Sequence, residues 1–282
     1  MADKATVERL RAEAKEIRKD LLKLCHQTLI HIGGDLSAAD LMTVIWQYAM
    51  HYDAANPKWE ERDRFVLSKG HASAVTSFEQ VRLGCYEKDD IYREYATDFG
   101  RFGMHSCNLI NPHVEVSSGS LGHGLPVATG IAKALQLRGN KVSRVYVVTG
   151  DGELDEGTMW EAFMWAAKEK LGNLVVFCDV NKLQFDGYTT DICPSEPLDK
   201  KLEAFNWRVR RINGHDMAAL VDEVDALPAP DSDVPTVIIC DTVKGKGVSF
   251  MENQIAWHAG MLGDADYEQA IAEVEAAFER GE

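Results

Sequence analysis

The sequence predicts an α/β fold, a parallel β-sheet with helices on both faces. Two observations favour it: apolar runs of strand length alternate with helical segments, and a glycine-containing turn follows one of these runs. The runs expected to form strands are Arg144–Thr149, Leu174–Asp179, Arg208–Ile212 and Thr236–Asp241. Strands that alternate with helices in this way are typical of a parallel sheet covered on both sides.

The N-terminal part is expected to be helical. Residues 4–30 predict one long helix, because apolar residues recur at helical spacing. These residues are Leu10, Ile17, Leu21, Leu24 and Leu29. A loop over residues 31–36 is expected next, with Ser37 as the N-cap of a helix over Ala38–Met50.

Further helices are expected between the strands. Asp63–Ser77 passes from a short apolar run into a helix, and Ser117–Gly124 opens a helix that runs to about Arg138. Two more are predicted near residues 158–170 and 216–226. The sequence has no internal repeat, and its only linker-like stretch, residues 227–235, is expected to be a surface loop. Residues 1–282 are therefore predicted to form a single domain.

Composition excludes several classes of function. The 282 residues carry a formal charge of −15, which disfavours a nucleic-acid partner. No apolar run reaches the roughly 20 residues needed to span a bilayer, so no membrane association is expected. The charged N-terminal segment does not resemble a signal peptide. The six cysteines lack metal-ligand spacing and indicate a reducing compartment, so the protein is expected to be cytoplasmic.

The strongest chemical signal is a Gly-Asp-Gly turn, residues 150–152, after one predicted strand, with Asn181 after the next. Asp151 and Asn181 are 30 residues apart, the length of one βαβ crossover. The two strand ends should therefore meet at the same edge of the sheet, where ligands bind. A carboxylate and an amide oxygen suit Mg²⁺, with phosphate oxygens completing its coordination. The glycines allow backbone amides to approach the anion.

This pair of turns resembles the motif of thiamine-diphosphate enzymes, which begins with Gly-Asp-Gly and ends in Asn. The resemblance implies thiamine diphosphate and Mg²⁺ (or Ca²⁺) as cofactors. It further implies that Asp151, Asn181 and the carbonyl of Leu183 are the metal ligands, and that Gly152 lies against the diphosphate.

Four more segments are similar to transketolases in particular. They are the segment HIGGD from His31, Gly-His-Ala at residues 70–72, VEVSSGSLGHGL at residues 114–125, and Trp257-His258-Ala-Gly. Together with the metal motif they extend from residue 31 to residue 262, in the order that the family shows. The chain is thus identified as resembling the diphosphate-binding part of a transketolase.

The resemblance implies roles for individual residues. His71 and His258 would contact the diphosphate, with Lys244 as a further candidate. Gly119 and Leu121 would line the thiamine pyrimidine. His31 and His105 would face the reacting oxygens of the substrate and exchange protons with it, beside His258. Glu156 and Glu161 match carboxylates at the subunit interface of the family, although both could be ordinary carboxylates at a helix start.

The surroundings of His105 depart from the family pattern. Ser106 replaces the usual proline and His113 the usual glycine, in the segment expected to line the substrate channel. A modified sugar phosphate or a sulfosugar therefore stays open as the ketose donor. His123 stands where the family usually has glutamine. Histidines outside the matching set are interpreted as structural; they are His26, His51, His113, His123 and His215.

The resemblance also implies a partner. Transketolases need a glutamate that protonates the pyrimidine and a clamp for the sugar phosphate, both on a pyrimidine-binding domain. This sequence ends about twenty residues after His258, where that domain would begin. The expected protein is the N-terminal subunit of a two-chain transketolase, in an α2β2 assembly, acting on a ketose and an aldose. The alternatives are a subunit of a 2-oxoacid or acetoin dehydrogenase, a deoxyxylulose phosphate synthase, and a non-catalytic thiamine-diphosphate-binding scaffold.

Overall fold

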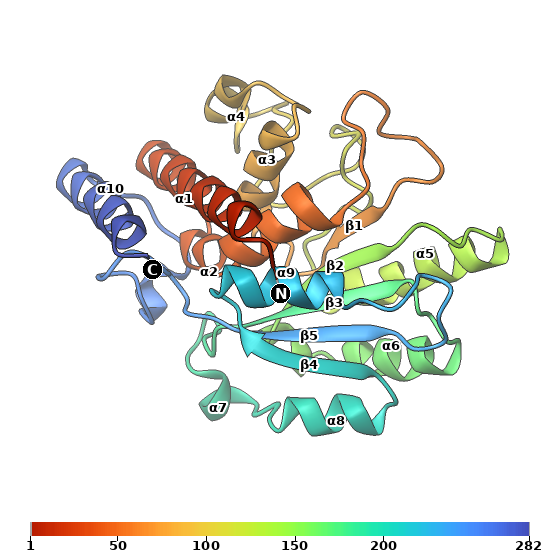
Figure 1. Cartoon of the computed structure of the whole chain (residues 1–282). Helices are drawn as coiled ribbons and strands as arrows, with labels where there is room; N and C mark the ends of the chain where they lie inside the picture. The colour runs from red at the N-terminus through yellow and green to blue at the C-terminus, as the bar shows by residue number, and fades with distance from the viewer. Residues whose placement is uncertain (1, 282) are drawn as a thin grey trace.

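The computed structural model describes residues 2–281 and has a five-stranded sheet at its centre (Figure 1). The strand order is β1-β2-β3-β5-β4, and every neighbouring pair is parallel. The strands are β1 (Arg64–Leu67), β2 (Val145–Gly150), β3 (Leu174–Val180), β4 (Arg208–Asn213) and β5 (Thr236–Asp241). The predicted parallel α/β fold is confirmed, and the short β1, expected only as an apolar run, adds a fifth strand.

Helices cover both faces of the sheet and form two separate cores. Side chains alternate across each strand, so Tyr146 and Val148 of β2 enter one core while Val145 and Val147 enter the other. The helices of the first core are α1 (Lys4–Gln27), α2 (Ile32–Val44), α3 (Ser73–Arg82), α9 (Met217–Asp225) and α10 (Asp264–Glu279). Those of the second core are α5 (Gly124–Leu137), α6 (Gly157–Lys168) and α8 (Leu198–Ala204).

Shorter elements complete the chain. They are the π-helix η1 (Ile45–Ala49), α4 (Lys88–Glu94), the 3-10 helix η2 (Gly152–Asp155), α7 (Thr189–Ile192) and the 3-10 helix η3 (Ile255–His258). Helix α10, which the sequence analysis did not predict, lies beside α1 (Figure 1).

The predicted loop before Ser37 is wrong. Helix α2 begins at Ile32, and the glycines that suggested a loop lie inside it. Gly33 is required for close packing, because a Cβ there would come within 2.5 Å of the Trp257 carbonyl oxygen. Ser37 is not an N-cap. It is fully buried within α2, and its hydroxyl donates to Asp179 of β3 at 2.7 Å.

The first helix is shorter than predicted. It starts as expected, with Asp3 as its N-cap accepting from the Thr6 amide at 3.0 Å, but it ends at Gln27 instead of residue 30. Leu29 therefore lies beyond the helix and is 43% exposed, whereas Leu10 and Ile17 are buried as the spacing predicts. The predicted helix over Ala38–Met50 likewise changes to π-helical geometry from Ile45.

Across residues 2–281, none of the helices combines the length and the apolar character that a bilayer crossing requires. All six cysteines are free thiols.

Candidate active site

The candidate site lies at the carboxyl edge of the sheet, where four parallel strands end. The turn after β1 carries His71, the turn after β2 carries Asp151, and Asn181 directly follows β3. Lys244 follows β5 by three residues. The predicted meeting of the strand ends is confirmed, because the backbone amide of Asp151 donates to the carbonyl oxygen of Asp179 at 3.1 Å.

Four histidines from distant parts of the sequence form one cluster at this edge. The ring centroid of His31 lies 5.3 Å from that of His71, 5.8 Å from that of His105 and 5.5 Å from that of His258. The rings of His71 and His258 are 5.4 Å apart. These are the four histidines that the sequence analysis singled out.

The environment of the histidine cluster, residues 31, 71, 105 and 258, lowers the pKa values of its imidazoles and would favour a bound anion. Burial, with help from His105 and Lys244, lowers the pKa of His31 to about 4. Burial and the neighbouring Lys244 lower the pKa of His258 to about 3, and burial with Lys69 holds the pKa of His71 well below its usual value. The imidazoles are therefore neutral at pH 7, and an anion among them would favour their protonation.

The predicted metal ligands come from two adjoining turns. The carboxylate of Asp151 accepts from the amide of Gly152 at 2.9 Å and from the amide of Lys182 at 2.6 Å. This second bond holds the Asp151 carboxylate against the neighbouring turn, which carries Asn181 and Leu183. The side-chain oxygen of Asn181 accepts from the Leu183 amide at 3.1 Å.

This donor set fits a hard cation. Burial, followed by repulsion from Asp179, raises the pKa of Asp151 to about 7, so a nearby cation would stabilise its charged form. A cation already lies against the third predicted ligand, because the ammonium of Lys244 donates to the Leu183 carbonyl oxygen at 3.1 Å. Within residues 2–281 no three His, Cys, Asp or Glu side chains are placed to hold a metal. A cation here would therefore need phosphate oxygens as further ligands.

Lys244 belongs to the site rather than to the surface. It is 2% exposed, and its ammonium lies 2.8 Å from Nδ1 of His258. Burial, then Lys69, lowers its pKa to about 8. The loop that carries it packs against α2, since the Gly245 amide donates to the Gly33 carbonyl oxygen at 3.0 Å.

The two glycines of the turns are needed for different reasons. A Cβ on Gly152 would lie 2.8 Å from Cγ of Gln184, so the turn after β2 packs closely on the loop after β3. Gly122 has φ +82, and a Cβ there would meet the side chain of Glu156 at 2.6 Å. Glu156 itself is exposed at the start of α6.

The remaining predicted residues lie around the histidine cluster or outside it. A Cβ on the exposed Gly119 would lie 3.9 Å from the ring of His105, so this segment borders the cluster, and the half-buried Leu121 follows it. Glu161 is exposed on α6. His113 packs elsewhere: its Nδ1 lies 2.8 Å from the hydroxyl of Tyr52, and its ring contacts Tyr86.

Sequence reasoning missed the buried polar residues that hold the strand ends together. Asp179 is fully buried and accepts from Lys69 at 2.5 Å, Ser37 at 2.7 Å and Asn181 at 3.2 Å. Glu153, 1% exposed, accepts from Ser68 at 2.5 Å and from the Gly122 amide at 2.9 Å. Charged residues inside strands and turns were the available signal, since charge is rarely buried unless it is paired.

Comparison with known proteins decides the family. The model described as "Transketolase, thiamine diphosphate binding domain" matches residues 17–277. The chain belongs to the transketolase family. The match confirms that the chain contains the thiamine-diphosphate-binding domain that the sequence resemblance implied.

Two relatives of similar length are named as transketolase subunits. The chain is 37% identical to an apulose-4-phosphate transketolase subunit of Actinobacillus succinogenes, over 94% of this chain and 95% of the relative. It is 36% identical to a 6-deoxy-6-sulfo-D-fructose transketolase subunit of Clostridium sp., over 94% and 96%.

Solved transketolases share the fold over part of their length. The enzyme from Campylobacter jejuni superposes with a TM-score of 0.84 at 26% identity, covering 97% of this chain and 43% of that one. The enzyme from Leishmania mexicana gives 0.82 at 28% identity, covering 99% and 42%. The chain therefore spans less than half the length of these transketolases.

Binding of thiamine diphosphate is expected to transfer protons to this transketolase site. An anion beside His71 and His258 raises their pKa from the low values set by burial, Lys69 and Lys244. A pKa that is higher in the bound state makes affinity rise as pH falls through that bound-state pKa. Calorimetry at pH 6 in two buffers of different ionisation enthalpy measures the uptake. His71→Asn should lower it by roughly half a proton, and the exposed His123→Asn should not. Equal uptake in both variants would place the diphosphate elsewhere.

Proposed function

We propose that this chain is the thiamine-diphosphate-binding subunit of a two-chain transketolase, which transfers a two-carbon ketol unit from a ketose to an aldose. The observation that carries the proposal is the histidine cluster beside the Gly-Asp-Gly turn, in a chain of the length of the relatives named as subunits. A chain of this kind supplies the diphosphate and metal end of the site.

The cofactor would be held by residues from four strand ends. Asp151, Asn181 and the Leu183 carbonyl oxygen would bind Mg²⁺ or Ca²⁺. The Leu183 carbonyl oxygen already accepts from the Lys244 ammonium, and this supports the proposal that a cation can reach it. His71 and Lys244 would donate to the diphosphate, beside His258. Two observations support this assignment. These side chains lie at the same edge of the sheet, and among residues 2–281 no carboxylate is hydrogen-bonded to the Lys244 ammonium, whose partners are His258 and the Leu183 carbonyl oxygen.

The proton-transfer groups would be neutral imidazoles. When bound, thiamine diphosphate supplies the carbanion chemistry of ketol transfer. His31 and His105 would hydrogen-bond to the donor hydroxyl and carbonyl oxygens and move protons at those atoms. Nδ1 of His31 is buried with no hydrogen-bond partner among the described residues, so its ring has bonding capacity for a substrate. His258 would serve both the diphosphate and the substrate.

The rest of the site would come from a partner chain that carries the pyrimidine-binding domain. Two relatives of nearly the same length are named as subunits, which supports a second polypeptide. We place the contact around Gly119, Leu121, Glu156 and Glu161, which lie on one stretch of exposed or half-buried surface bordering His105 and α6. An α2β2 assembly, with two active sites linked through the glutamates, is the arrangement that we propose.

The donor is proposed to be a ketose phosphate or a modified sugar related to it. The relatives are named for apulose 4-phosphate and for 6-deoxy-6-sulfo-D-fructose, so unusual donors occur among proteins of this length. The segment that follows His105 differs from ordinary transketolases at Ser106 and His113. We further propose that the protein acts in the cytoplasm, which its six free thiols support.

A coupled ketol-transfer assay tests the proposal. The chain alone is expected to turn over no ketose donor, whereas adding the chain encoded beside it should restore turnover at a one-to-one ratio. It should also tighten thiamine binding by mass action. A partner with its pyrimidine-activating glutamate changed to alanine is the control and should assemble without activity.

The same assay separates the alternatives. Oxidation of a 2-oxoacid in place of ketol transfer would identify a dehydrogenase subunit. Cofactor binding without turnover, for every donor and with the partner present, would identify a scaffold. Full activity of the isolated chain would refute the two-chain assignment.

A further inference from the structure

A histidine outside the cluster, His215, connects helix α2 with the loop that follows β5. It lies in the turn between β4 and α9, and its side chain is 11% exposed. Nδ1 of its ring lies 2.8 Å from a carboxylate oxygen of Asp40 on α2, and Nε2 accepts from the backbone amide of Val243 at 2.9 Å. The residue after Val243 is Lys244, the buried lysine of the candidate site. His215 thus bonds to the backbone directly before this lysine.

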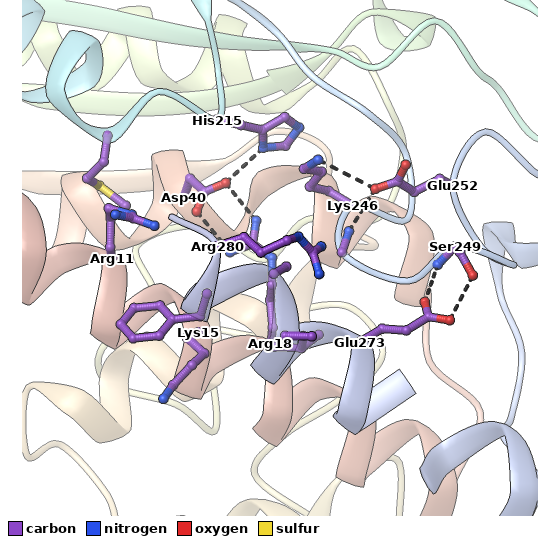
Figure 2. A pocket seen from close by; sticks show the side chains of 16 residues that line it. Arg11, Lys15, Arg18, Asp40, His215, Lys246, Ser249, Glu252, Glu273 and Arg280 are labelled. Atoms are coloured by element: carbon purple, nitrogen blue, oxygen red, sulfur yellow. Dashed lines mark hydrogen bonds and ion pairs between the residues drawn. The ribbon is translucent and has the colours of Figure 1, made fainter. Parts of the chain in front are cut away.

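The two hydrogen bonds define the form of the His215 imidazole. A backbone amide can only donate, so Nε2 carries no proton and the ring proton is on Nδ1, which donates to Asp40. Arg18 binds the same carboxylate through two nitrogens, at 2.8 and 2.6 Å (Figure 2). Burial opposes the charge of Asp40, but Arg18 and His215 outweigh it and hold its pKa below the usual value. A charged Asp40 therefore keeps His215 in the neutral form that can accept from the amide.

The backbone on either side of Lys244 is held by three hydrogen bonds. Its carbonyl oxygen accepts from the Asn253 amide at 2.9 Å. The amide of Gly245 donates to the carbonyl oxygen of Gly33 at 3.0 Å. Both of these bonds join backbone groups. The third is the bond to His215, which ends on a side chain and can therefore be removed by substitution.

A cavity leaves one side of this loop without packed side chains. It lies between α1, α10 and the loop over residues 246–252, and its volume is about 380 Å³ (Figure 2). His215, Lys246 and Glu252 line it. The ion pair of Lys246 with Glu252 is loose, at 3.6 Å. On the side of the cavity, the position of the loop therefore depends on hydrogen bonds more than on packing.

We propose that His215 is a positioning residue for cofactor binding, which holds Lys244 in place through the Val243 amide. The proposal rests on the function proposed above, in which Lys244 donates to the diphosphate. The ammonium of Lys244 lies 2.8 Å from Nδ1 of His258 and donates to the Leu183 carbonyl oxygen at 3.1 Å. Contacts of this length require a defined backbone position.

Loss of the bond to His215 leaves the Val243 amide without its partner and makes other loop conformations more favourable. A ligand that binds one conformation has an apparent affinity proportional to the fraction of molecules in that conformation. The bond between His215 and Val243 therefore contributes to cofactor affinity, although His215 does not touch the proposed diphosphate site.

Two substitutions separate the two hydrogen bonds of His215. The side-chain oxygen of glutamine can take the place of Nε2, so His215→Gln keeps an acceptor for the Val243 amide and gives up the donor to Asp40. The shorter amide of asparagine can take the place of Nδ1, so His215→Asn keeps the donor to Asp40 and gives up the acceptor. The two variants differ in which contact they lose, and both replace the ring by an uncharged amide.

Calorimetry on the full chain with Mg²⁺ measures the binding of thiamine diphosphate. We expect the unpaired amide in His215→Asn to leave the loop in place in about one molecule in ten, so that the cofactor binds about tenfold more weakly than to the wild type. His215→Gln should restore the affinity to within about threefold of the wild type, since the loop keeps its acceptor.

Leu220→Ala is the matched control for stability. Leu220 is fully buried on α9, and its truncation opens a cavity in the same core while it leaves both hydrogen bonds of His215 in place. Leu220→Ala should lower the thermal unfolding midpoint without changing cofactor affinity. If Leu220→Ala weakens cofactor binding as much as His215→Asn does, or if His215→Gln binds as weakly as His215→Asn, His215 is an ordinary structural residue and the proposal is wrong.

Hydrogen exchange in the absence of cofactor tests the loop itself. Peptides that cover residues 242–253 should exchange faster in His215→Asn than in the wild type, relative to peptides of β3, and should do so in neither of the other two variants. Unchanged exchange in His215→Asn would overturn the positioning role, whatever the affinity. If the wild type binds no thiamine diphosphate under any condition, the function proposed above is wrong, and the exchange rates still decide whether His215 holds the loop.

Discussion

Replacing Asp151 by alanine is expected to weaken binding of thiamine diphosphate with Mg²⁺ by about 100-fold or more, which corresponds to about 2.8 kcal/mol. Asp151 is the one carboxylate among the proposed ligands, and the Asn181 and Leu183 oxygens carry no net charge. Without it a cation at this site would have only neutral protein ligands. Lys244, which donates to the Leu183 carbonyl oxygen, would then be left to offset the charge of the diphosphate at that position.

The fold of the Asp151→Ala variant is expected to stay intact. Burial and Asp179 make the charged form of Asp151 unfavourable in the free protein, as its raised pKa shows, so its removal relieves a buried charge. Calorimetry gives the cofactor affinity, and thermal unfolding without ligand gives the stability. Asp155→Ala is the matched control, because the exposed Asp155 lies on the same turn and accepts from the side-chain amide of Gln184 at 2.7 Å. If Asp151→Ala in EDTA binds thiamine diphosphate as tightly as the wild type does with Mg²⁺, the metal assignment is wrong.

The sequence was sufficient to predict how the ligand-binding edge is built. The runs that became β2, β3 and β5 are mainly apolar, and a turn residue with an oxygen ligand follows two of them. In a parallel sheet such turns meet by geometry, so local patterns predicted a long-range contact. The four histidines were found through their family segments, because nothing in the local sequence of His31 or His105 marks a site.

The sequence was misleading where glycine had two possible meanings. Gly33 and Gly34 were interpreted as a loop, since glycine lowers helix propensity. In the structure both lie in α2. The Trp257 carbonyl oxygen leaves no space for a side chain at Gly33, and a Cβ on Gly34 would already be in contact with the ring of His71. That requirement comes from residues more than 35 positions away, and no local pattern contains it.

Buried charge is the second feature that local patterns do not reveal. Lys69 directly precedes the Gly-His-Ala segment and Glu153 directly follows the Gly-Asp-Gly turn, yet their partners Asp179 and Ser68 depend on how the strands are ordered in the sheet. The hydrogen bonds of Asp40 with Arg18 and His215 have the same origin, since three separate elements bring these side chains together. His215 was accordingly interpreted as an ordinary structural residue.

Breaking the buried pair of Lys69 and Asp179 is expected to give the largest loss of stability. Their side chains are 2% and 0% exposed. Burial opposes the charge of Asp179, but Lys69 and the hydrogen bonds that the carboxylate accepts outweigh it and keep its pKa below the usual value. Lys69→Met leaves that charge buried without its ion-pair partner, and the free energy of unfolding should fall by about 3–5 kcal/mol. Denaturation by urea, without cofactor or partner, measures the change.

Two further variants decide whether the loss comes from the unpaired charge. Adding Asp179→Asn to Lys69→Met should recover much of the loss, because the amide can still bond to Ser37 and no longer carries a charge. Lys170→Met breaks an ion pair of similar length, 2.7 Å, whose side chains are 65% and 69% exposed, and should cost less than about 1 kcal/mol. If Lys69→Met costs no more than Lys170→Met, or if the double variant is as unstable as Lys69→Met alone, an uncompensated charge is not the cause. The strand ends would then be held together mainly by the apolar cores on either side of the sheet.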